Sequence, residues 1–230
     1  MQTLELGEAA WKQRLDEGAA ELGVRLDESQ LDALWRYGVM LRERNQHVNL
    51  TSIVSPEGIL TLHMLDSLSV ASHLGDARSI IDIGTGGGFP GIPLAVAFPE
   101  RKFTLIDGTQ KKIRFVNEGI EALDIRNATA LAARAEDLSR HEGTQSQYDL
   151  VIARAVATLA ELVHNAGRLV APGGRLLAMK GRLPEDEIRA VPRAWHAEVI
   201  PLRVPGLDAE RHLVSLTRVS PQAKGKPGPR

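Results

Sequence analysis

The chain has 230 residues, of which 43% are hydrophobic and 25% are charged. This is the balance of one ordinary globular domain that can bury its own core. It contains no cysteine, which excludes disulfides, zinc-thiolate sites and thiol nucleophiles. The N-terminus lacks the basic and apolar segments of a secretion signal, and no stretch has the length of a membrane span. We therefore expect a cytoplasmic protein without membrane contact.

The net charge of −1 conceals an asymmetry along the chain. Residues 1–150 contain 15 Lys and Arg against 22 Asp and Glu, whereas residues 151–230 contain 13 against 7. The positive excess in the C-terminal third suits contact with a polyanion. Scattered, solvated charge explains these counts equally well.

Three amphipathic helices are predicted within the first 75 residues, because apolar residues recur there at helical spacing. Ser55 followed by Pro56 is typical of a helix start, since proline fits the first helical position. We assign residues 1–75 to a helical N-terminal cap. The expected helices cover about 4–22, 27–45 and 55–68.

From Ser79 onward, short apolar runs alternate with helical patterns, which indicates an α/β fold with a parallel sheet covered on both faces. Two later runs predict an antiparallel hairpin at one end of the sheet. We assign this domain to residues 76–220 and a basic Pro/Gly-rich tail to 221–230. The expected strands are 79–83, 103–107, 128–132, 148–153 and 174–180, the hairpin runs are 196–204 and 211–219, and the expected helices lie near 91–98, 110–122 and 157–170.

The stretch IDIGTGGGFPGIP, which leaves the first strand, marks the expected ligand site. Ligands of open α/β sheets bind beyond the carboxyl ends of the strands, and Gly84, Gly86 and Gly88 let the backbone approach a ligand there. The spacing Gly86-x-Gly88-x-x-Gly91 also matches the dinucleotide pattern. An NAD-dependent oxidoreductase is therefore one alternative.

Two features of the same region favour a ligand without phosphates. Pro90 and Pro93 remove N–H donors close to the helix start that would bind a pyrophosphate. Carboxylates, Asp82, Asp107 and Glu136, occur where the strands end. Acids suit a ligand with hydroxyls and positive charge, such as S-adenosylmethionine (SAM), with Asp107 accepting hydrogen bonds from the ribose.

Two of these acids have alternative roles. Asp82 either orders the glycine loop or contacts the ligand. Glu136 either contacts the ligand or serves as an N-terminal acid of a short helix.

A set of motifs in collinear order resembles the RsmG (GidB) family, over about residues 20–220. The motifs are Asn49-Leu50-Thr51, His63-x-x-Asp66-Ser67-Leu68, Asp82-x-Gly84-Thr85-Gly86-x-Gly88-Phe89-Pro90-Gly91, Arg134-Ala135-Glu136, Arg154-Ala155 and Met179-Lys180-Gly181.

The resemblance implies a Rossmann-like SAM-dependent methyltransferase sheet with a helical N-terminal extension. It implies methylation of guanine N7 at guanosine 527 of 16S small-subunit ribosomal RNA. The expected partner is 16S rRNA or the small-subunit ribosomal particle, and we expect a monomer. The cofactor-binding residues implied by position are Gly84, Gly86, Gly88, Phe89, Asp107, Gly108, Thr109, Ala135, Glu136 and Arg154.

The chemistry needs no general base, because guanine N7 carries a free lone pair, and alignment of two bound reactants supplies the rate. We expect Arg154 and Lys180, which follow apolar strands, to position the target nucleotide, with the methionine carboxylate of SAM as an alternative partner. A salt bridge from Arg154 to Glu136 is the structural alternative. The sequence shows no metal-ligand cluster.

Further residues are expected to serve binding or packing. Asn49 and Arg182 are candidate substrate-binding residues, although Asn49 also suits a turn and the charge of Arg182 also suits solvent. His63 and Asp66 more often pin a helix than act in catalysis. A SAM-dependent enzyme acting on another RNA, a small molecule or a protein is the remaining alternative.

Overall fold

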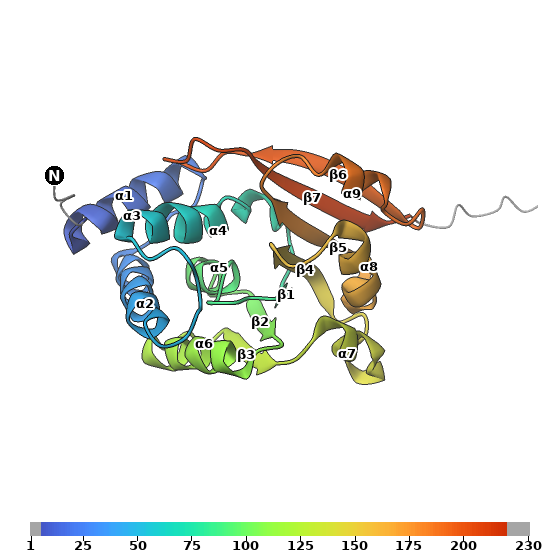
Figure 1. Cartoon of the computed structure of the whole chain (residues 1–230), viewed down its shortest axis with the longest axis horizontal. Helices are drawn as coiled ribbons and strands as arrows, with labels where there is room; N and C mark the ends of the chain where they lie inside the picture. The colour runs from blue at the N-terminus through green and yellow to red at the C-terminus, as the bar shows by residue number, and fades with distance from the viewer. Residues whose placement is uncertain (1–5, 220–230) are drawn as a thin grey trace, which may run out of the picture.

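The computed structural model describes residues 6–219 and contains a seven-stranded sheet with helices on both faces (Figure 1). The strand order is β3-β2-β1-β4-β5-β7-β6. The first five strands are parallel, and β7 runs antiparallel to both β5 and β6. The strands are β1 (Ser79–Ile83), β2 (Lys102–Asp107), β3 (Ala128–Ala132), β4 (Tyr148–Arg154), β5 (Val170–Lys180), β6 (Trp195–Leu202) and β7 (Arg211–Arg218).

The expected fold class, a mostly parallel α/β sheet with one antiparallel hairpin, is confirmed. Among residues 6–219, none of the helices combines the length and apolar character that crossing a bilayer requires. The helices are α1 (Glu8–Glu21), α2 (Glu28–Asn45), α3 (Pro56–Gly58), a π-helical segment (Ile59–Leu65), α4 (Asp66–Leu68), α5 (Gly91–Ala97), α6 (Gln110–Ala122), α7 (Ala135–Arg140), α8 (Leu159–Ala166) and α9 (Glu185–Arg189).

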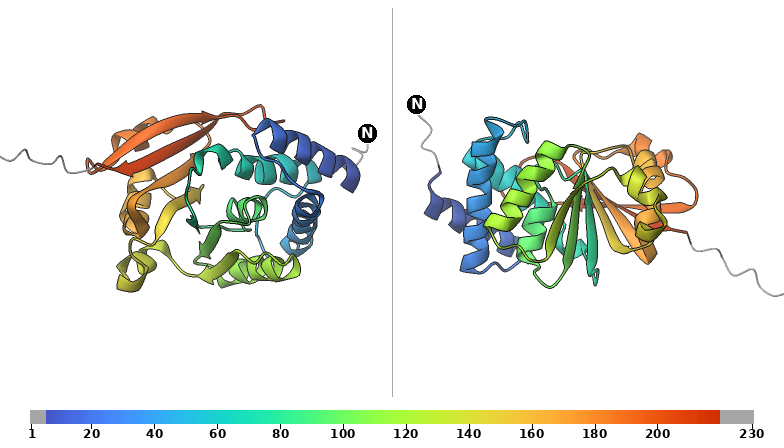
Figure 2. Two further views of the ribbon diagram at one scale, coloured as in Figure 1. Left: turned by 180° about the vertical axis from the view of Figure 1, so that it is seen from behind. Right: turned by 90° about the horizontal axis from the view of Figure 1, so that it is seen from below.

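Successive residues of each parallel strand point to opposite faces of the sheet, and this alternation builds two cores. Ile80 and Leu105 belong to the core beneath α1–α6, whereas Ile81 and Ile106 belong to the core beneath α7 and α8. Viewed from below, the two sets of helices lie on either side of the sheet (Figure 2). The near-continuous apolar strands follow from this burial on both faces.

The N-terminal helices share one core with the sheet. Trp11, Tyr37 and Met64 are buried in the same cluster as Ile80 and other strand residues. The division of the chain at residue 75 stays a prediction, and the proposed tail at 221–230 lies outside the described residues. The cap therefore packs on the side of the sheet that α5 and α6 cover.

Local signals explain where the cap helices begin. Asp27 and Gln30 form a capping box at the start of α2. The hydroxyl oxygen of Ser55 accepts the N–H of Gly58, with Pro56 at the first helical position of α3. The third predicted helix is present, but its central residues, Ile59–Leu65, form a π-helix, which a hydrophobic pattern does not distinguish from an α-helix.

Several boundaries differ from the expected ones by a few residues, among them the start of α1 and both ends of β6. Two differences change the description of an element. β5 begins at Val170, because Pro172 and Gly173 continue the strand with a register shift against β4. The helix expected near 157–170 is α8 followed by a 3₁₀ turn at Gly167–Leu169.

Tyr37 connects the cap to the glycine loop. Its hydroxyl donates to the carbonyl oxygen of Gly87 at 2.9 Å, and the residue is fully buried. Its ring lies against Gly119, where an added Cβ would come within 2.4 Å of the ring. The cap thus bonds directly to the backbone of the predicted ligand loop.

We expect Tyr37→Phe to lower the free energy of unfolding by about 1–2 kcal/mol, because the buried Gly87 carbonyl loses its partner while the ring packing is kept. Urea unfolding followed by circular dichroism measures this. Tyr148→Phe is the control, since the Tyr148 hydroxyl makes no hydrogen bond to any residue in 6–219. Equal losses in both variants would contradict the role given to Tyr37.

Candidate active site

The glycine loop adopts backbone angles that would be strained in a residue with a side chain. Gly84, Gly86 and Gly88 have φ of 67°, 58° and 92°, all in the left-handed region that glycine enters freely. At Gly88 an added Cβ would also lie 2.3 Å from the hydroxyl oxygen of Tyr37. Both backbone conformation and close packing therefore require glycine at this position.

Asp82 orders this loop from beneath. Its Oδ2 accepts the hydroxyl of Thr85 at 2.6 Å and the N–H of Gly91 at 2.9 Å, and the residue is fully buried. Its Oδ1 has no hydrogen-bond partner among the described residues. Burial raises the pKa of Asp82 to about 6, because removal from water disfavours the charged form. Of the two roles left open for Asp82, the contacts are those of loop ordering.

Asp107 holds the loop from the neighbouring strand. Its Oδ2 accepts the N–H of Gly86 at 3.1 Å, and its Oδ1 accepts the N–H of Thr109 at 2.8 Å. The ammonium of Lys112 lies 3.7 Å from Oδ2. Each oxygen retains a lone pair, so the carboxylate is fixed in place and still able to accept hydrogen bonds from a ligand.

A cavity of about 340 Å³ opens at the carboxyl ends of β1, β2 and β3. Six of the ten predicted cofactor residues line it: Gly84, Asp107, Gly108, Thr109, Ala135 and Glu136. Val156, Ala157 and Asn165 form part of its other walls. Residues that were predicted from the ends of three strands therefore lie around one cavity.

Glu136 lies in the first turn of α7 and also lines the cavity. Its side chain is 34% exposed, and its carboxylate lies 3.6 Å from the guanidinium of Arg134. Both roles considered for Glu136, helix-terminal acid and ligand contact, are compatible with this position.

The remaining predicted cofactor residues lie toward the cap. Gly86 and Gly88 shape the loop backbone, and Phe89 is 4% exposed. The Phe89 ring stacks on the imidazole of His63 with centroids 4.4 Å apart and meets Tyr37 edge to face at 5.9 Å. The guanidinium of Arg154 lies 5.4 Å from the centroid of the same ring.

Arg154 pairs with the cap instead of with Glu136. Its Nη1 donates to Oδ2 of Asp66 and to the carbonyl oxygen of Leu62, both at 2.9 Å. Arg211, at the start of β7, donates from Nε to Oδ1 of the same Asp66 at 2.8 Å. One carboxylate, only 5% exposed, thus joins the cap to β4 and β7. The predicted alternative, a salt bridge from Arg154 to Glu136, is wrong. The acid that pairs with Arg154 is Asp66, which is distant from it in the sequence.

His63 completes this cluster as a neutral imidazole. Burial and the nearby charge of Arg154 lower its pKa to about 3. Nη2 of Arg154 lies 3.3 Å from Nδ1, and since arginine only donates, Nδ1 is the acceptor and Nε2 carries the proton. Nε2 then donates to the hydroxyl of Thr51 at 2.9 Å. His63 and Asp66 pin the cap helix to its neighbours, as their spacing suggested.

Lys180, the second predicted cation, is also engaged within the protein. Its Nζ donates to the carbonyl oxygen of Ala157 at 2.7 Å and pairs with Glu187 at 2.8 Å. Arg182 and Asn49 are exposed. The turn that contains Asn49 is ordered by Asn45, whose Oδ1 accepts the N–H groups of Leu50 and Thr51.

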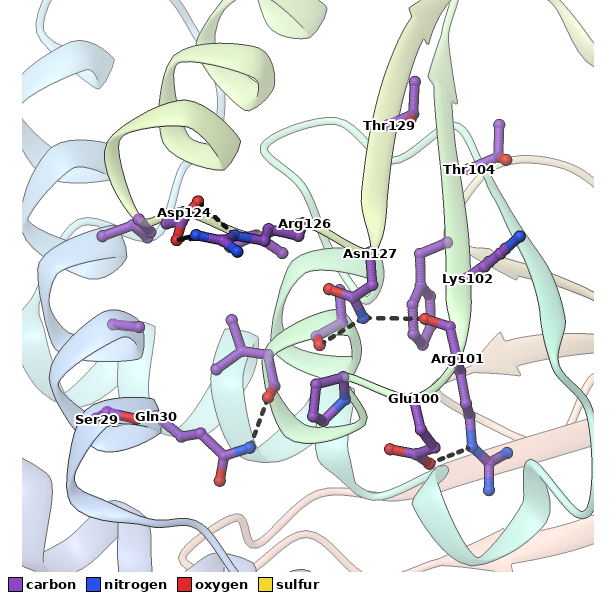
Figure 3. A pocket seen from close by; sticks show the side chains of 17 residues that line it. Ser29, Gln30, Glu100, Arg101, Lys102, Thr104, Asp124, Arg126, Asn127 and Thr129 are labelled. Atoms are coloured by element: carbon purple, nitrogen blue, oxygen red, sulfur yellow. Dashed lines mark hydrogen bonds and ion pairs between the residues drawn. The ribbon is translucent and has the colours of Figure 1, made fainter.

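A larger cavity, of about 700 Å³, lies at the opposite edge of the sheet, where β2 and β3 begin (Figure 3). Two of its polar side chains, Asn127 and Arg126, are occupied by the chain itself. Nδ2 of Asn127 donates to three backbone carbonyls, and Arg126 pairs with Asp124. Ligands of parallel sheets bind at the carboxyl edge, so we assign the site to the smaller cavity.

Residues 30–214 match the family model described as rRNA small subunit methyltransferase G (GidB). The chain belongs to this family. It is 44% identical to the Ribosomal RNA small subunit methyltransferase G of Methylococcus capsulatus over 202 residues, which cover 88% of this chain and 96% of that protein. The protein of the same name from Stenotrophomonas maltophilia is 44% identical over 204 residues, covering 88% of this chain and 93% of that protein.

The fold also resembles solved methyl-transferring proteins. Fibrillarin from Aeropyrum pernix, solved with bound S-adenosyl-L-methionine, superposes with a TM-score of 0.50 at 14% identity, covering 61% of this chain and 66% of that chain. At this identity the likeness shows the shared fold alone. Family membership rests on the sequence relatives and fits the motifs collected at the loop.

Sequence reasoning missed three residues that shape the site: Tyr37, Arg211 and Glu187. Each acts through a contact with a distant segment: the Gly87 carbonyl, the Asp66 carboxylate and the Lys180 ammonium. Nothing in the local sequence marks these pairs, apart from the general rule that a buried hydroxyl or charge needs a partner.

We expect Asp82→Asn to change the pH dependence of stability. Folded Asp82 binds its proton more tightly than the unfolded chain does, since its pKa rises from 3.8 to about 6. The protonated Asp82 side chain therefore stabilises the fold below about pH 4, and this stabilisation is lost as the pH rises through about 6. Its size is about 1.4 kcal/mol of unfolding free energy per unit of pKa difference between the folded and unfolded states. Asparagine keeps an acceptor for Thr85 and Gly91 but never ionises.

The measurement is urea unfolding of wild type and Asp82→Asn at about pH 4.5 and about pH 7. The variant should gain stability relative to wild type as the pH rises. Asp137→Asn, an exposed acid, is the control and should show a constant difference. Parallel pH profiles for wild type and Asp82→Asn would disprove the role given to burial.

We expect Asp66→Ala to lower the free energy of unfolding by about 3 kcal/mol, because two partly buried guanidinium groups lose their shared carboxylate. Asp137→Ala removes an exposed pair and should cost at most about 0.5 kcal/mol. Urea unfolding measures both. A loss at Asp66 no larger than that at Asp137 would show that the cluster does not stabilise the cap.

Proposed function

We propose that this protein transfers the methyl group of SAM to N7 of guanosine 527 in 16S small-subunit ribosomal RNA. Family membership over residues 30–214 supports the reaction class. The observation that carries the assignment of the site is the cavity at the carboxyl edge, whose lining includes the carboxylates of Asp107 and Glu136.

The residues at this cavity fit SAM better than a dinucleotide. The backbone N–H groups at the start of α5 are occupied, since Gly91 donates to Asp82 and Ile92 donates to the carbonyl oxygen of Gly88. Pro93 has no N–H to offer. A pyrophosphate would find no donors there, whereas carboxylates suit the hydroxyls and positive charge of SAM. The NAD-dependent alternative loses its phosphate site.

In this proposal the chain holds and aligns both reactants. Asp107, fixed by two backbone N–H groups, accepts hydrogen bonds from the ribose hydroxyls. Gly84, Gly108, Thr109 and Ala135 supply close backbone approach, and Glu136 lies at the rim. Gly86, Gly88 and Phe89 keep the loop in shape.

SAM supplies an electrophilic methyl group, whose bond to sulfur breaks as the lone pair of guanine N7 forms the new bond. The protein therefore needs no proton acceptor, and alignment within a site shielded from water is its contribution. Neutral His63 is buried behind Phe89 and serves to position it. Arg154, held on Asp66, presents a fixed cation near the loop for the target nucleotide.

RNA contact falls to exposed groups around the site. Arg182 and Asn49 are exposed and are proposed to bind the RNA, with phosphate contacts setting its position. We propose that the 16S rRNA is recognised as the free RNA or within the small-subunit particle, by a cytoplasmic monomer.

The test joins binding and product analysis. Calorimetric titration should show binding of SAM and none of NAD. Small-subunit particles from a strain that lacks the gene should gain N7-methylguanine at position 527 when incubated with the protein and SAM. Asp107→Ala should weaken SAM binding at least tenfold, a loss typical of hydrogen bonds to a charged group.

Asp137→Ala serves as the matched control, because this acid lies on α7, is exposed, and its side chain pairs with the exposed Arg140. The proposal fails if NAD binds tightly without a response to SAM, or if the deletion strain keeps the full modification.

A further inference from the structure

The segment 155–158, between β4 and α8, forms part of the cavity wall beside the glycine loop. Val156 and Ala157 line the cavity. The methyl groups of Val156 lie against Gly84, where an added Cβ would come within 2.5 Å of Cγ2. The position of this short segment therefore sets the width of the cavity next to the loop.

The backbone of this segment is held in an uncommon conformation. Ala155 has φ of 55°, in the left-handed region that residues with a Cβ seldom enter. Such angles persist only where surrounding contacts impose them, and they cluster at functional sites. Contacts from neighbouring elements must therefore hold the segment in place.

Three side chains from outside the segment supply these contacts. Glu161, on α8, accepts the N–H and the hydroxyl of Thr158 through Oε2. Lys180, at the end of β5, donates from Nζ to the carbonyl oxygen of Ala157 at 2.7 Å. Glu187, on α9, accepts from that same Nζ at 2.8 Å and from the N–H of Leu159 at 2.9 Å through one oxygen, Oε2. Glu187 thus fixes Leu159, the residue that follows the segment, directly, and it fixes Ala157 through Lys180.

This pair is sheltered enough for its charge to matter. The Lys180 side chain is 15% exposed and that of Glu187 is 28% exposed, so solvent screens their attraction less than it screens a fully exposed pair. The helix that carries Glu187, α9, has no fully buried residue, and its Ile188 packs partly buried against the core beneath α7 and α8.

We propose that Glu187 is a positioning residue of the active site, which acts through Lys180 and Ala157 to hold the wall of the SAM cavity formed by residues 155–158. This inference rests on the proposed function, because it takes SAM as the ligand of the cavity. It also assigns Lys180 a positioning role: its Nζ is committed to the wall, and it affects the RNA only through that wall.

The experiment is a double-mutant cycle on the full chain with Glu187→Ala, Lys180→Met and the double variant. SAM affinity is measured by calorimetry, and KM and kcat are measured for methylation of small-subunit particles. Each single variant should weaken SAM binding about tenfold and raise the KM for SAM by a larger factor than it lowers kcat. The double variant should be no weaker than the worse single one, because both remove the same support.

Glu185→Ala is the matched control. Glu185 lies on the same helix as Glu187, and its side chain, which is 67% exposed, pairs with Arg189 at 3.8 Å. This variant should keep the SAM affinity of wild type within about twofold. Lys180→Arg, which keeps a cationic donor, should recover part of the affinity lost in Lys180→Met.

The outcomes separate this inference from the proposed function. If wild type fails to bind SAM, the proposed function is wrong. If wild type binds SAM and methylates the particles while Glu187→Ala matches wild type in SAM affinity, the positioning role of Glu187 is overturned. If Lys180→Met raises the KM for RNA alone, Lys180 contacts the nucleotide directly and the inference is likewise overturned. Should Glu187→Ala not fold, Glu187→Gln, which keeps shape without charge, replaces it under the same criteria.

Discussion

The glycine loop is held by hydrogen bonds from three directions, and the rest of the site depends on this constraint. Asp82 accepts from Gly91 beneath the loop, Asp107 accepts from Gly86 on one side, and Tyr37 donates to Gly87 from the cap. Glycine has more backbone freedom than any other residue, so without these hydrogen bonds the loop would sample many conformations. The loop is therefore arranged before any ligand arrives, which reduces the entropy lost on binding.

The same constraint explains why the cap belongs to the active site. The ring of Phe89 leaves the loop and packs between His63 and Tyr37, both cap residues. Behind it, Asp66 receives one arginine from β4 and another from β7. Removing a cap contact would therefore disturb the loop and the sheet edge together, because a single buried cluster joins them.

Positive charge at the site is used mainly to build it. Arg154 and Lys180 follow strands and point toward the ligand edge in a sequence-based view, yet each bonds to a carboxylate and a backbone carbonyl of the chain. Fixed cations suit the proposed chemistry, since a mobile positive charge placed on N7 would oppose the cationic product. In the proposed function, phosphate contact with the RNA is assigned to exposed residues such as Arg182, where binding depends on salt.

Periodicity and glycine spacing in the sequence were enough to predict the α/β class, most strand positions and the ligand edge. β1 and α6 match their expected ranges because apolar alternation and helical spacing are local properties. Asp107 was identified because strand ends of a parallel sheet converge, a rule that follows from topology. The partners of Arg154, Tyr37 and Lys180 were decided only by the tertiary structure. Each pairs with a group that local sequence does not mark, since a hydrogen bond across the fold depends on packing and not on spacing along the chain.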